Sequence, residues 1–157
     1  MPLFEQVLDK YPDAVKIVFK HYPLTFHEQA MPAALASMAA AEQGKFWEYH
    51  DQLFINQNSL GSAKYVEIAQ NLGLDIKKFS LDMMRPSLRQ KIEGDITEAK
   101  RLGVTGTPTI LRATSTPGAM LEQVTMINSA PASSANSTWL HKRFRIDGVN
   151  RSSCSKS

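Results

Sequence analysis

Cysteine is almost absent from this sequence: the chain of 157 residues has a single one, Cys154, close to its C-terminus. One cysteine excludes an intramolecular disulfide and says little about the redox compartment. The histidines are scattered, and no His, Cys or acidic cluster has the spacing of metal ligands. The sequence therefore predicts neither a metal site nor a cofactor.

Long apolar runs are absent as well. No segment approaches the roughly 18 to 20 apolar residues that a membrane span needs, and no basic-then-apolar segment at the N-terminus resembles a signal peptide. A hydrophobic content of 43% is ordinary for a globular protein, and a chain of this length can bury one good core. We expect a single domain without a membrane span. These features do not identify the cellular compartment.

Basic charge is not concentrated in the body of the chain. Residues 1–111 carry 12 Lys and Arg against 13 Asp and Glu, whereas residues 112–157 carry 6 against 2. The formal net charge of +3 therefore originates in the tail. No stripe of aromatic and basic side chains suggests base stacking, and we expect no nucleic-acid partner.

The apolar pattern predicts a helix, a strand, several helices and a second strand, in that order. The first helix covers residues 3–11, and an apolar run at 14–22 reads as a buried strand that Pro23 ends. A long helical block follows, and "TIL" at 109–111 is the second strand. Glycines end three of the helices: Gly44, Gly73 and Gly103. The predicted class is α/β, predominantly helical, with a helical insertion between the strands.

Four motifs make this pattern specific. They are "VKIVFKHYPL" (15–24), "QGKFWEYHDQLF" (43–54), "LGLD" (72–75) and "AKRLGVTGTPT" (99–109). In this order and at this spacing the chain resembles the DsbA-like thiol-disulfide oxidoreductases of the thioredoxin superfamily, from residue 1 to about 112. A weaker similarity at 118–128 looks like the family's C-terminal helix, so the expected thioredoxin-like domain covers residues 1–128.

The family exchanges protein disulfides through a Cys-x-x-Cys at the N-terminus of its first helix, where the helix dipole stabilises a thiolate. This sequence begins inside that helix, so we expect a truncated fold that lacks the first strand and both catalytic cysteines. The resemblance also implies an extracytoplasmic setting, usually the periplasm. Catalysis by Cys154 is not expected, because it lies in the Ser-rich segment "RSSCSKS".

Thr107 and Pro108 match the family's cis-proline pair, whose backbone N–H and C=O groups can pair with an extended substrate peptide as an added strand does. Gly106 gives the chain room to turn. The alternative is an ordinary trans Thr-Pro turn, since most X-Pro bonds are trans. The sequence thus predicts Gly106, Thr107 and Pro108 as substrate-binding residues, extended or unfolded polypeptide as the partner, and no catalytic residue.

Other conspicuous side chains are assigned to packing. His50 shares a helical face with Phe46 and Trp47, and neither His21 nor His27 has a nucleophile to serve. Methionines at four positions could line a peptide groove, but filling core gaps is the commoner role. Those methionines are Met31, Met38, Met83 and Met84.

Residues 129–157 form a Ser-rich basic tail that we expect to be flexible. The missing first strand would lie between the strands at 15–20 and 109–112, and its loss would leave both strands unpaired. The tail segment "TWLHKRFRID" (138–147) is one candidate to fill the gap. A second copy of the chain is the other, and the interpretation favours this homo-oligomer by exchange of elements.

Three functions fit these observations. The first is a family member that has lost its dithiol and no longer exchanges disulfides. The second is a cysteine-free peptide-binding or chaperone-like module. The third is a related isomerase that acts on a bound glutathione conjugate, although it would need an N-terminal polar site that this chain lacks. We rank them in that order.

Overall fold

The computed structural model describes residues 6–7, 9–11, 15–114, 122–128 and 145–146. The backbone is helical at residues 6–7 and 9–10, inside the first predicted helix. The remaining elements, in chain order, are β1 (Val15–His21), α2 (Ala30–Ala41), α3 (Phe46–Ile55), a 3-10 turn η1 (Gln57–Ser59), α4 (Ser62–Asn71), α5 (Ile76–Met83), α6 (Pro86–Arg101), β2 (Thr109–Thr114), β3 (Glu122–Asn128) and β4 (Arg145–Ile146).

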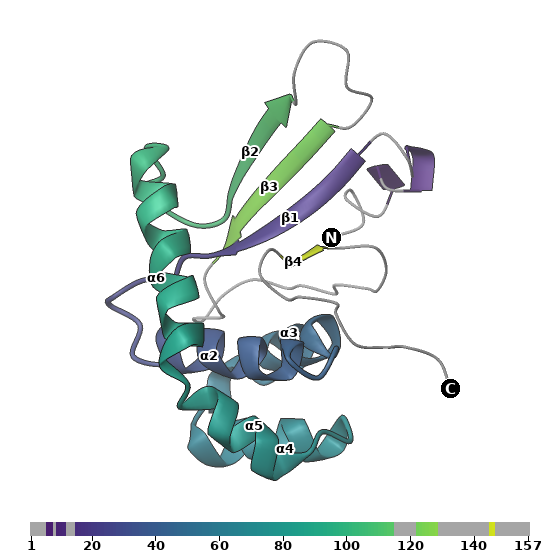
Figure 1. Cartoon of the computed structure of the whole chain (residues 1–157), viewed down its shortest axis with the longest axis vertical. Coiled ribbons are helices and arrows are strands. Elements are labelled where there is room, and N and C mark those ends of the chain that lie inside the picture. The colour runs from purple at the N-terminus through teal and green to yellow at the C-terminus, as the bar shows by residue number, and fades with distance from the viewer. Residues whose placement is uncertain (1–5, 8, 12–14, 115–121, 129–144, 147–157) are drawn as a thin grey trace.

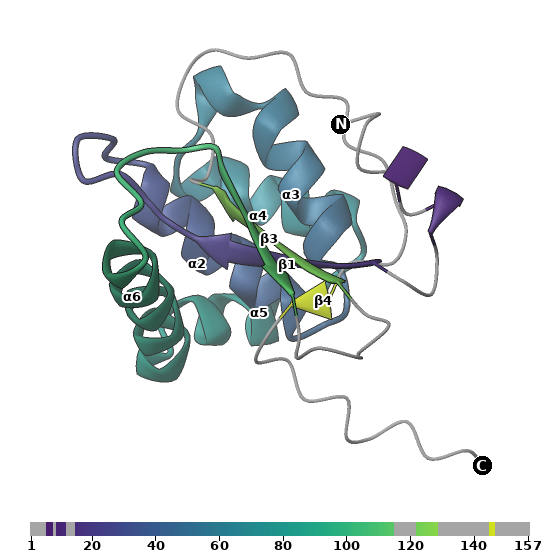
Figure 2. The ribbon, with the colours of Figure 1, turned by 90° about the horizontal axis from the view of Figure 1, so that it is seen from above.

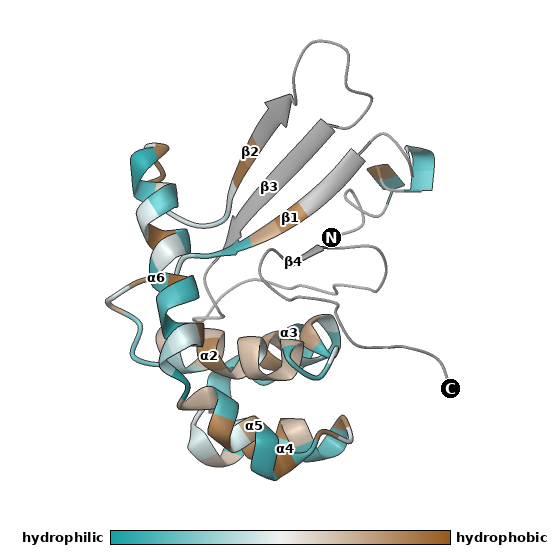
Figure 3. Cartoon of the chain, viewed as in Figure 1, coloured by the Kyte–Doolittle hydropathy of each residue, from teal (hydrophilic) through white to brown (hydrophobic). Residues whose placement is uncertain are grey.

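The helices from α2 to α5 form a layer beside one end of the sheet, and α6 runs from this layer along the sheet (Figure 1). Helix α2 lies at the centre of the layer and is apolar along most of its length (Figure 3). Its alanines are buried on every side, which lets the neighbouring helices approach closely. Tyr49, Leu53, Tyr65, Ile68 and Phe79 pack around Ala33, Ala36 and Ala40 of α2 to form the main core.

Helix ends follow the sequence signals. Gly44, Gly73 and Gly103 have positive φ angles of 74°, 70° and 77° just beyond the ends of α2, α4 and α6, where a residue with a Cβ would be disfavoured. Pro86 opens α6 within its first turn, a position that needs no backbone N–H. These local rules explain why the predicted helices are found at nearly the predicted positions.

The sheet has the strand order β2-β3-β1-β4. Strand β3 runs parallel to β1, with Val15 opposite Glu122 and His21 opposite Asn128. It runs antiparallel to β2, with Thr109 opposite Ile127. The two strands that the sequence predicts are therefore joined through a third strand rather than left apart.

This arrangement corrects two expectations. Residues 122–128 were expected in a C-terminal helix, but they form β3. The expected gap between the strands at 15–20 and 109–112 is filled by β3 itself, so the reason for expecting a tail strand or a second copy there does not hold. Of the tail candidate at 138–147, only Arg145–Ile146 is described, as β4 at the outer side of β1 opposite Val18 and Phe19.

The two faces of β1 pack against different helices. Lys20 contacts Asp95 and Glu98 of α6, whereas Phe19 and His21 contact Phe46 of α3. Because successive side chains of a strand point to opposite faces, α6 and α3 lie on opposite sides of the sheet, as the view from above shows (Figure 2).

Candidate functional site

The loop between α6 and β2 holds the three residues that the sequence predicts as substrate-binding. Gly106 and Thr107 are half-buried, and Pro108 is exposed at the start of β2. The peptide bond between Thr107 and Pro108 is cis, as predicted. The three residues are thus consecutive in one turn that exposes Pro108, and their role in binding stays a prediction.

Hydrogen bonds fix this turn to the end of α6 and to the chain after β1. The backbone N–H of Val104 donates to the carbonyl of Ala99 over 3.0 Å, and the hydroxyl of Tyr22 donates to the carbonyl of Val104 over 3.3 Å. The hydroxyl of Thr109 donates to the carbonyl of Gly106 over 2.7 Å. The turn is therefore held at both ends, while Pro108 between them remains accessible to a partner.

Strand β2 lies at one edge of the sheet. Within the described part of the chain, no strand pairs with its outer side. Along β2, Leu111 packs against Ala99 and Val104, while Ile110 faces the other way with 51% of its surface exposed. An edge strand with an exposed apolar side chain can accept an extended peptide through backbone hydrogen bonds and alternate side-chain contacts.

The strand register places other groups at the same end of the sheet. Thr109 lies opposite Ile127, which lies opposite Lys20. The next residue of β1, His21, lies opposite Asn128, where β3 ends. Pro108 and His21 are therefore at one end of the sheet, separated by the end of β3.

An ion cluster joins this end of β1 to α6. The Lys20 ammonium lies 3.1 Å from a carboxylate oxygen of Asp95 and 3.1 Å from one of Glu98, and the backbone N–H of His21 donates to Asp95 over 3.0 Å. Burial opposes the charged form of Lys20, but the two carboxylates outweigh it and raise the pKa of Lys20. For Asp95 burial dominates its hydrogen bonds and raises the pKa of that carboxyl.

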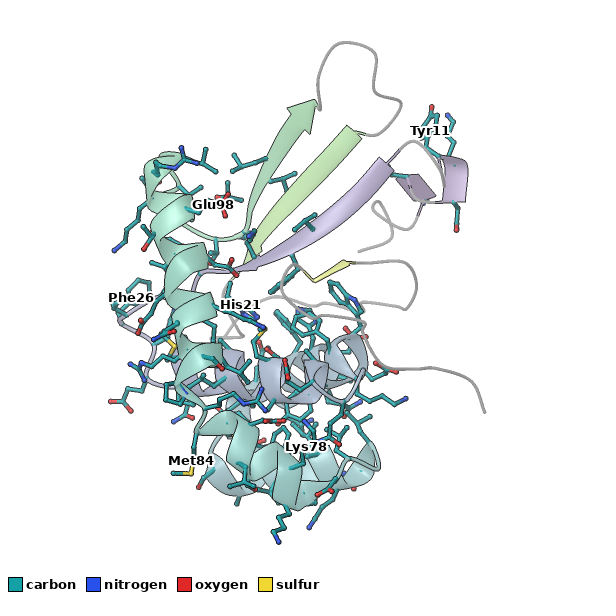
Figure 4. All side chains as sticks on the ribbon, in the orientation of Figure 1. Tyr11, His21, Phe26, Lys78, Met84 and Glu98 are labelled. Atoms are coloured by element: carbon teal, nitrogen blue, oxygen red, sulfur yellow. The ribbon has the colours of Figure 1, made fainter. Side chains whose placement is uncertain are left out.

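On the opposite face, His21 is buried among aromatic rings at the centre of the molecule (Figure 4). Its ring centroid lies 5.0 Å from that of Phe19 and 5.9 Å from that of Phe46. Neither ring nitrogen has a hydrogen-bond partner among the described residues. Burial, with a smaller effect of nearby His50, lowers the pKa of His21 to about 3, so the ring is neutral at pH 7.

The remaining candidates have structural roles or lie elsewhere. His50 is buried beside Asp51, and Met31, Met38 and Met83 pack in the core. Met84 departs from this pattern, because 82% of its surface is exposed. Cys154 lies outside the described residues. Among the residues that the structure does describe, no group of three His, Cys, Asp or Glu side chains is placed to hold a metal ion.

Sequence reasoning missed Asp95 and Lys20, although a signal was present. Asp95 falls three residues after buried Ile92 and four before buried Ala99, which is the spacing of one helix face. Lys20 interrupts an apolar strand. A carboxylate on a buried helix face and a cation in a buried strand each require a partner of opposite charge. Asp95 and Lys20 are partners of each other.

The described helices include none that is both long and apolar enough for a membrane span. A protein-family model described as Thioredoxin matches residues 2–113. No solved structure matches the chain significantly.

Among curated proteins, the chain is 38% identical over 109 residues to the Na(+)/H(+) antiporter NhaA 3 of Salinispora tropica, which covers 69% of the chain and 17% of that protein. It is 35% identical over 99 residues to the antiporter NhaA of Herminiimonas arsenicoxydans, with 63% and 16% covered. The match to NhaA 1 of Mycolicibacterium vanbaalenii is 34% over 109 residues, with 68% and 18% covered.

The chain thus spans about a sixth of the length of these relatives. The matched region corresponds to β1, the helical block and the turn at Pro108, which are the elements that build the candidate site. From the family-model match over residues 2–113 and the fold of that region, we conclude that the chain belongs to the thioredoxin family.

Proposed function

We propose that this chain is a DsbA-like thioredoxin-fold module that binds extended polypeptide at Gly106, Thr107 and Pro108 and along the outer edge of β2. It does not exchange disulfides by itself. The observation that carries the proposal is the position of β2, which starts directly after exposed Pro108 and forms an edge of the sheet.

The geometry supports binding through the backbone. An added strand would use the N–H and C=O groups on the outer side of β2, and Ile110 would offer an apolar contact beside them. Leu111 already packs against Ala99 and Val104. Neighbouring residues of β2 therefore have different roles: Leu111 anchors the strand to the protein, and Ile110 is accessible to a partner. Backbone pairing gives affinity with little sequence preference, as a module for unfolded chains requires.

The chemistry of disulfide exchange requires a nucleophilic thiolate and a second thiol to resolve the mixed disulfide. This sequence has one cysteine, Cys154, so it cannot form the internal disulfide of such a couple. We therefore propose that the fold descends from DsbA-like oxidoreductases and that this chain does not have their activity. Transport, which the names of the relatives indicate for those whole proteins, is not proposed for it.

The test is the binding of fluorescent extended peptides with alternating apolar residues, followed by anisotropy with the full chain. Ile110→Glu introduces a charge at the edge strand and should weaken binding by about tenfold or more while leaving the fold intact, because the side chain is half exposed. Ile55→Glu, the same exchange at a site of 69% exposure on α3, is the matched control and should bind as the wild type does.

Absence of peptide binding by the wild-type chain would refute the proposal. Equal weakening by both variants would show that binding occurs through general apolar contact and would also refute it. Amide exchange adds an independent readout, since a bound strand should protect the outward backbone N–H groups of β2 and leave those of α4 unchanged.

A further inference from the structure

Val104 is the residue at which the loop before β2 leaves α6. Its backbone N–H donates to the carbonyl of Ala99 over 3.0 Å, and the N–H of Gly103 donates to the carbonyl of Lys100 over 3.0 Å. Together with the positive φ of Gly103 and the packing of Val104 on Ala99, these bonds form the Schellman motif that ends many helices. The N–H side of Val104 is therefore fixed by α6 itself.

The carbonyl side of Val104 is held from a different part of the chain. Tyr22, the first residue after β1, donates its hydroxyl to this carbonyl over 3.3 Å. Its half-buried ring packs against Ala99 and Val104. Figures 1 and 2 show the chain that leaves β1 and the loop between α6 and β2 at the same end of the sheet, beside α6. Tyr22 thus bridges two segments that are 82 residues apart in sequence.

The end of β1 fixes the position of Tyr22 in turn. The backbone N–H of His21 donates to the carboxylate of Asp95 over 3.0 Å. Asp95 precedes Ala99 by one turn of α6, so both groups that hold Val104 are referred to the same helix. The tyrosine hydroxyl is therefore presented to Val104 from a backbone that is attached to α6.

A short chain separates Val104 from the turn at Pro108. The carbonyl of Gly106 accepts the hydroxyl of Thr109 over 2.7 Å, so exposed Thr105 alone lies between the two fixed residues Val104 and Gly106. One residue spans less than about 4 Å and cannot absorb a displacement of its neighbour. A shift of the Val104 carbonyl is therefore transmitted to Gly106 and to the residues that follow it.

We propose that Tyr22 is a positioning residue for peptide binding: its hydroxyl holds Gly106, Thr107 and Pro108 in the arrangement that pairs with an extended polypeptide. This inference rests on the proposed function. Without the hydroxyl, the free turn occupies the binding arrangement for a smaller fraction of the time, and the apparent dissociation constant rises in proportion. The contacts between peptide and turn are unchanged once formed, so the association rate falls and the dissociation rate stays the same.

The test compares the full chain with Tyr22→Phe, which keeps the packed ring and removes the hydroxyl. Stopped-flow anisotropy with the fluorescent extended peptides measures both rates. Tyr22→Phe should raise the dissociation constant about threefold or more, through slower association at an unchanged dissociation rate. Amide exchange of the free variant should become faster at residues 105–107 and stay at the wild-type rate in α4.

Tyr49→Phe is the matched control. Tyr49 also donates its hydroxyl to a backbone carbonyl, that of Tyr65 over 2.9 Å, but it is buried in the helical layer. This variant should have a lower free energy of unfolding than the wild type and the same peptide affinity. Urea denaturation of both variants separates a change in affinity from a general loss of stability.

Equal affinity of Tyr22→Phe and the wild type would overturn this inference and leave the proposed function intact. Equal weakening by the two Phe variants would overturn it as well, because the effect would then follow general stability. No peptide binding by the wild-type chain would refute the proposed function and, with it, this role of Tyr22.

Discussion

The backbone N–H of His21 donates a hydrogen bond of 3.0 Å to Oδ2 of Asp95, and this bond joins the end of β1 to the middle of α6. The same carboxylate holds the ammonium of Lys20 through its other oxygen, at 3.1 Å. One side chain thus satisfies a backbone donor and a half-buried cation at the end of the sheet where the turn at Pro108 begins. Its removal should therefore affect more than a surface ion pair would.

Asp95→Ala should lower the free energy of unfolding by about 1–3 kcal/mol, because it leaves the N–H of His21 without its acceptor and Lys20 with Glu98 alone. Asp95→Asn keeps an acceptor oxygen and should cost less. Urea denaturation of both variants measures the difference. An Ala variant as stable as the Asn variant would contradict the importance of the hydrogen bond.

Stability should fall in acid through His21. Its pKa is about 3 in the folded chain against 6.5 for an ordinary histidine, so between these two pH values the unfolded chain binds a proton that the folded chain does not. The contribution of neutral His21 to the free energy of unfolding is complete above pH 6.5. It decreases as the pH falls toward 3, by up to about 1.4 kcal/mol per pH unit. Urea denaturation across this window measures it.

His21→Phe keeps an aromatic ring against Phe19 and Phe46 and should remove this part of the pH dependence. The matched control is His27→Phe, which changes a half-buried histidine of the loop before α2 and should retain it. A pH dependence that is the same in the His21 variant and the wild type would show that another group is responsible.

Two residues of α3 should respond very differently to truncation. Leu53 is 1% exposed in the main core, whereas Ile55 is 69% exposed. Leu53→Ala should cost about 2–5 kcal/mol because it opens a cavity among packed side chains. Ile55→Ala should change stability by less than about 0.5 kcal/mol. Thermal or urea unfolding of the pair tests the burial directly, and equal losses would contradict this packing of α3.

The purified chain should not catalyse the reduction of a protein disulfide, since it cannot form a dithiol couple with Cys154 alone. Turnover would be measured with a protein disulfide and an excess of small thiol, against the small thiol by itself. Cys154→Ser separates adventitious chemistry of the tail from a true site. Turnover that persists in this variant would overturn the proposal that this chain does not exchange disulfides.

Local signals predicted much of this fold. The glycines at 44, 73 and 103 mark backbone positions with positive φ, and Pro86 marks a helix start; both follow from what a single residue permits. The turn at Gly106 to Pro108 was found through the order of four motifs. The part that failed was 122–128, where the resemblance favoured a helix although Val124, Thr125 and Ile127 favour a strand.

The register could not be predicted, because it depends on which distant strand offers a partner. Val15 and Glu122 are neighbours in space, but no local pattern near either residue specifies the other. The ion cluster of Lys20, Asp95 and Glu98 was missed for a related reason. In the sequence, each of these charged residues resembles an ordinary surface residue. Lys20 and Asp95 become partners only because α6 packs on β1.

The place of β3 inside the sheet sets the order in which this chain can fold. Helices α2 to α6 pack on one another within residues 30–101 and can assemble before residues 122–128 are synthesised, whereas β1 pairs with β3 only after those residues are present. Pairings between such distant segments have a high contact order and form slowly. During synthesis the backbone groups of β1 therefore lack their β3 partners until residues 122–128 are added. A chaperone that shields β1 in this period should raise the yield of folded protein more than one that binds the helices.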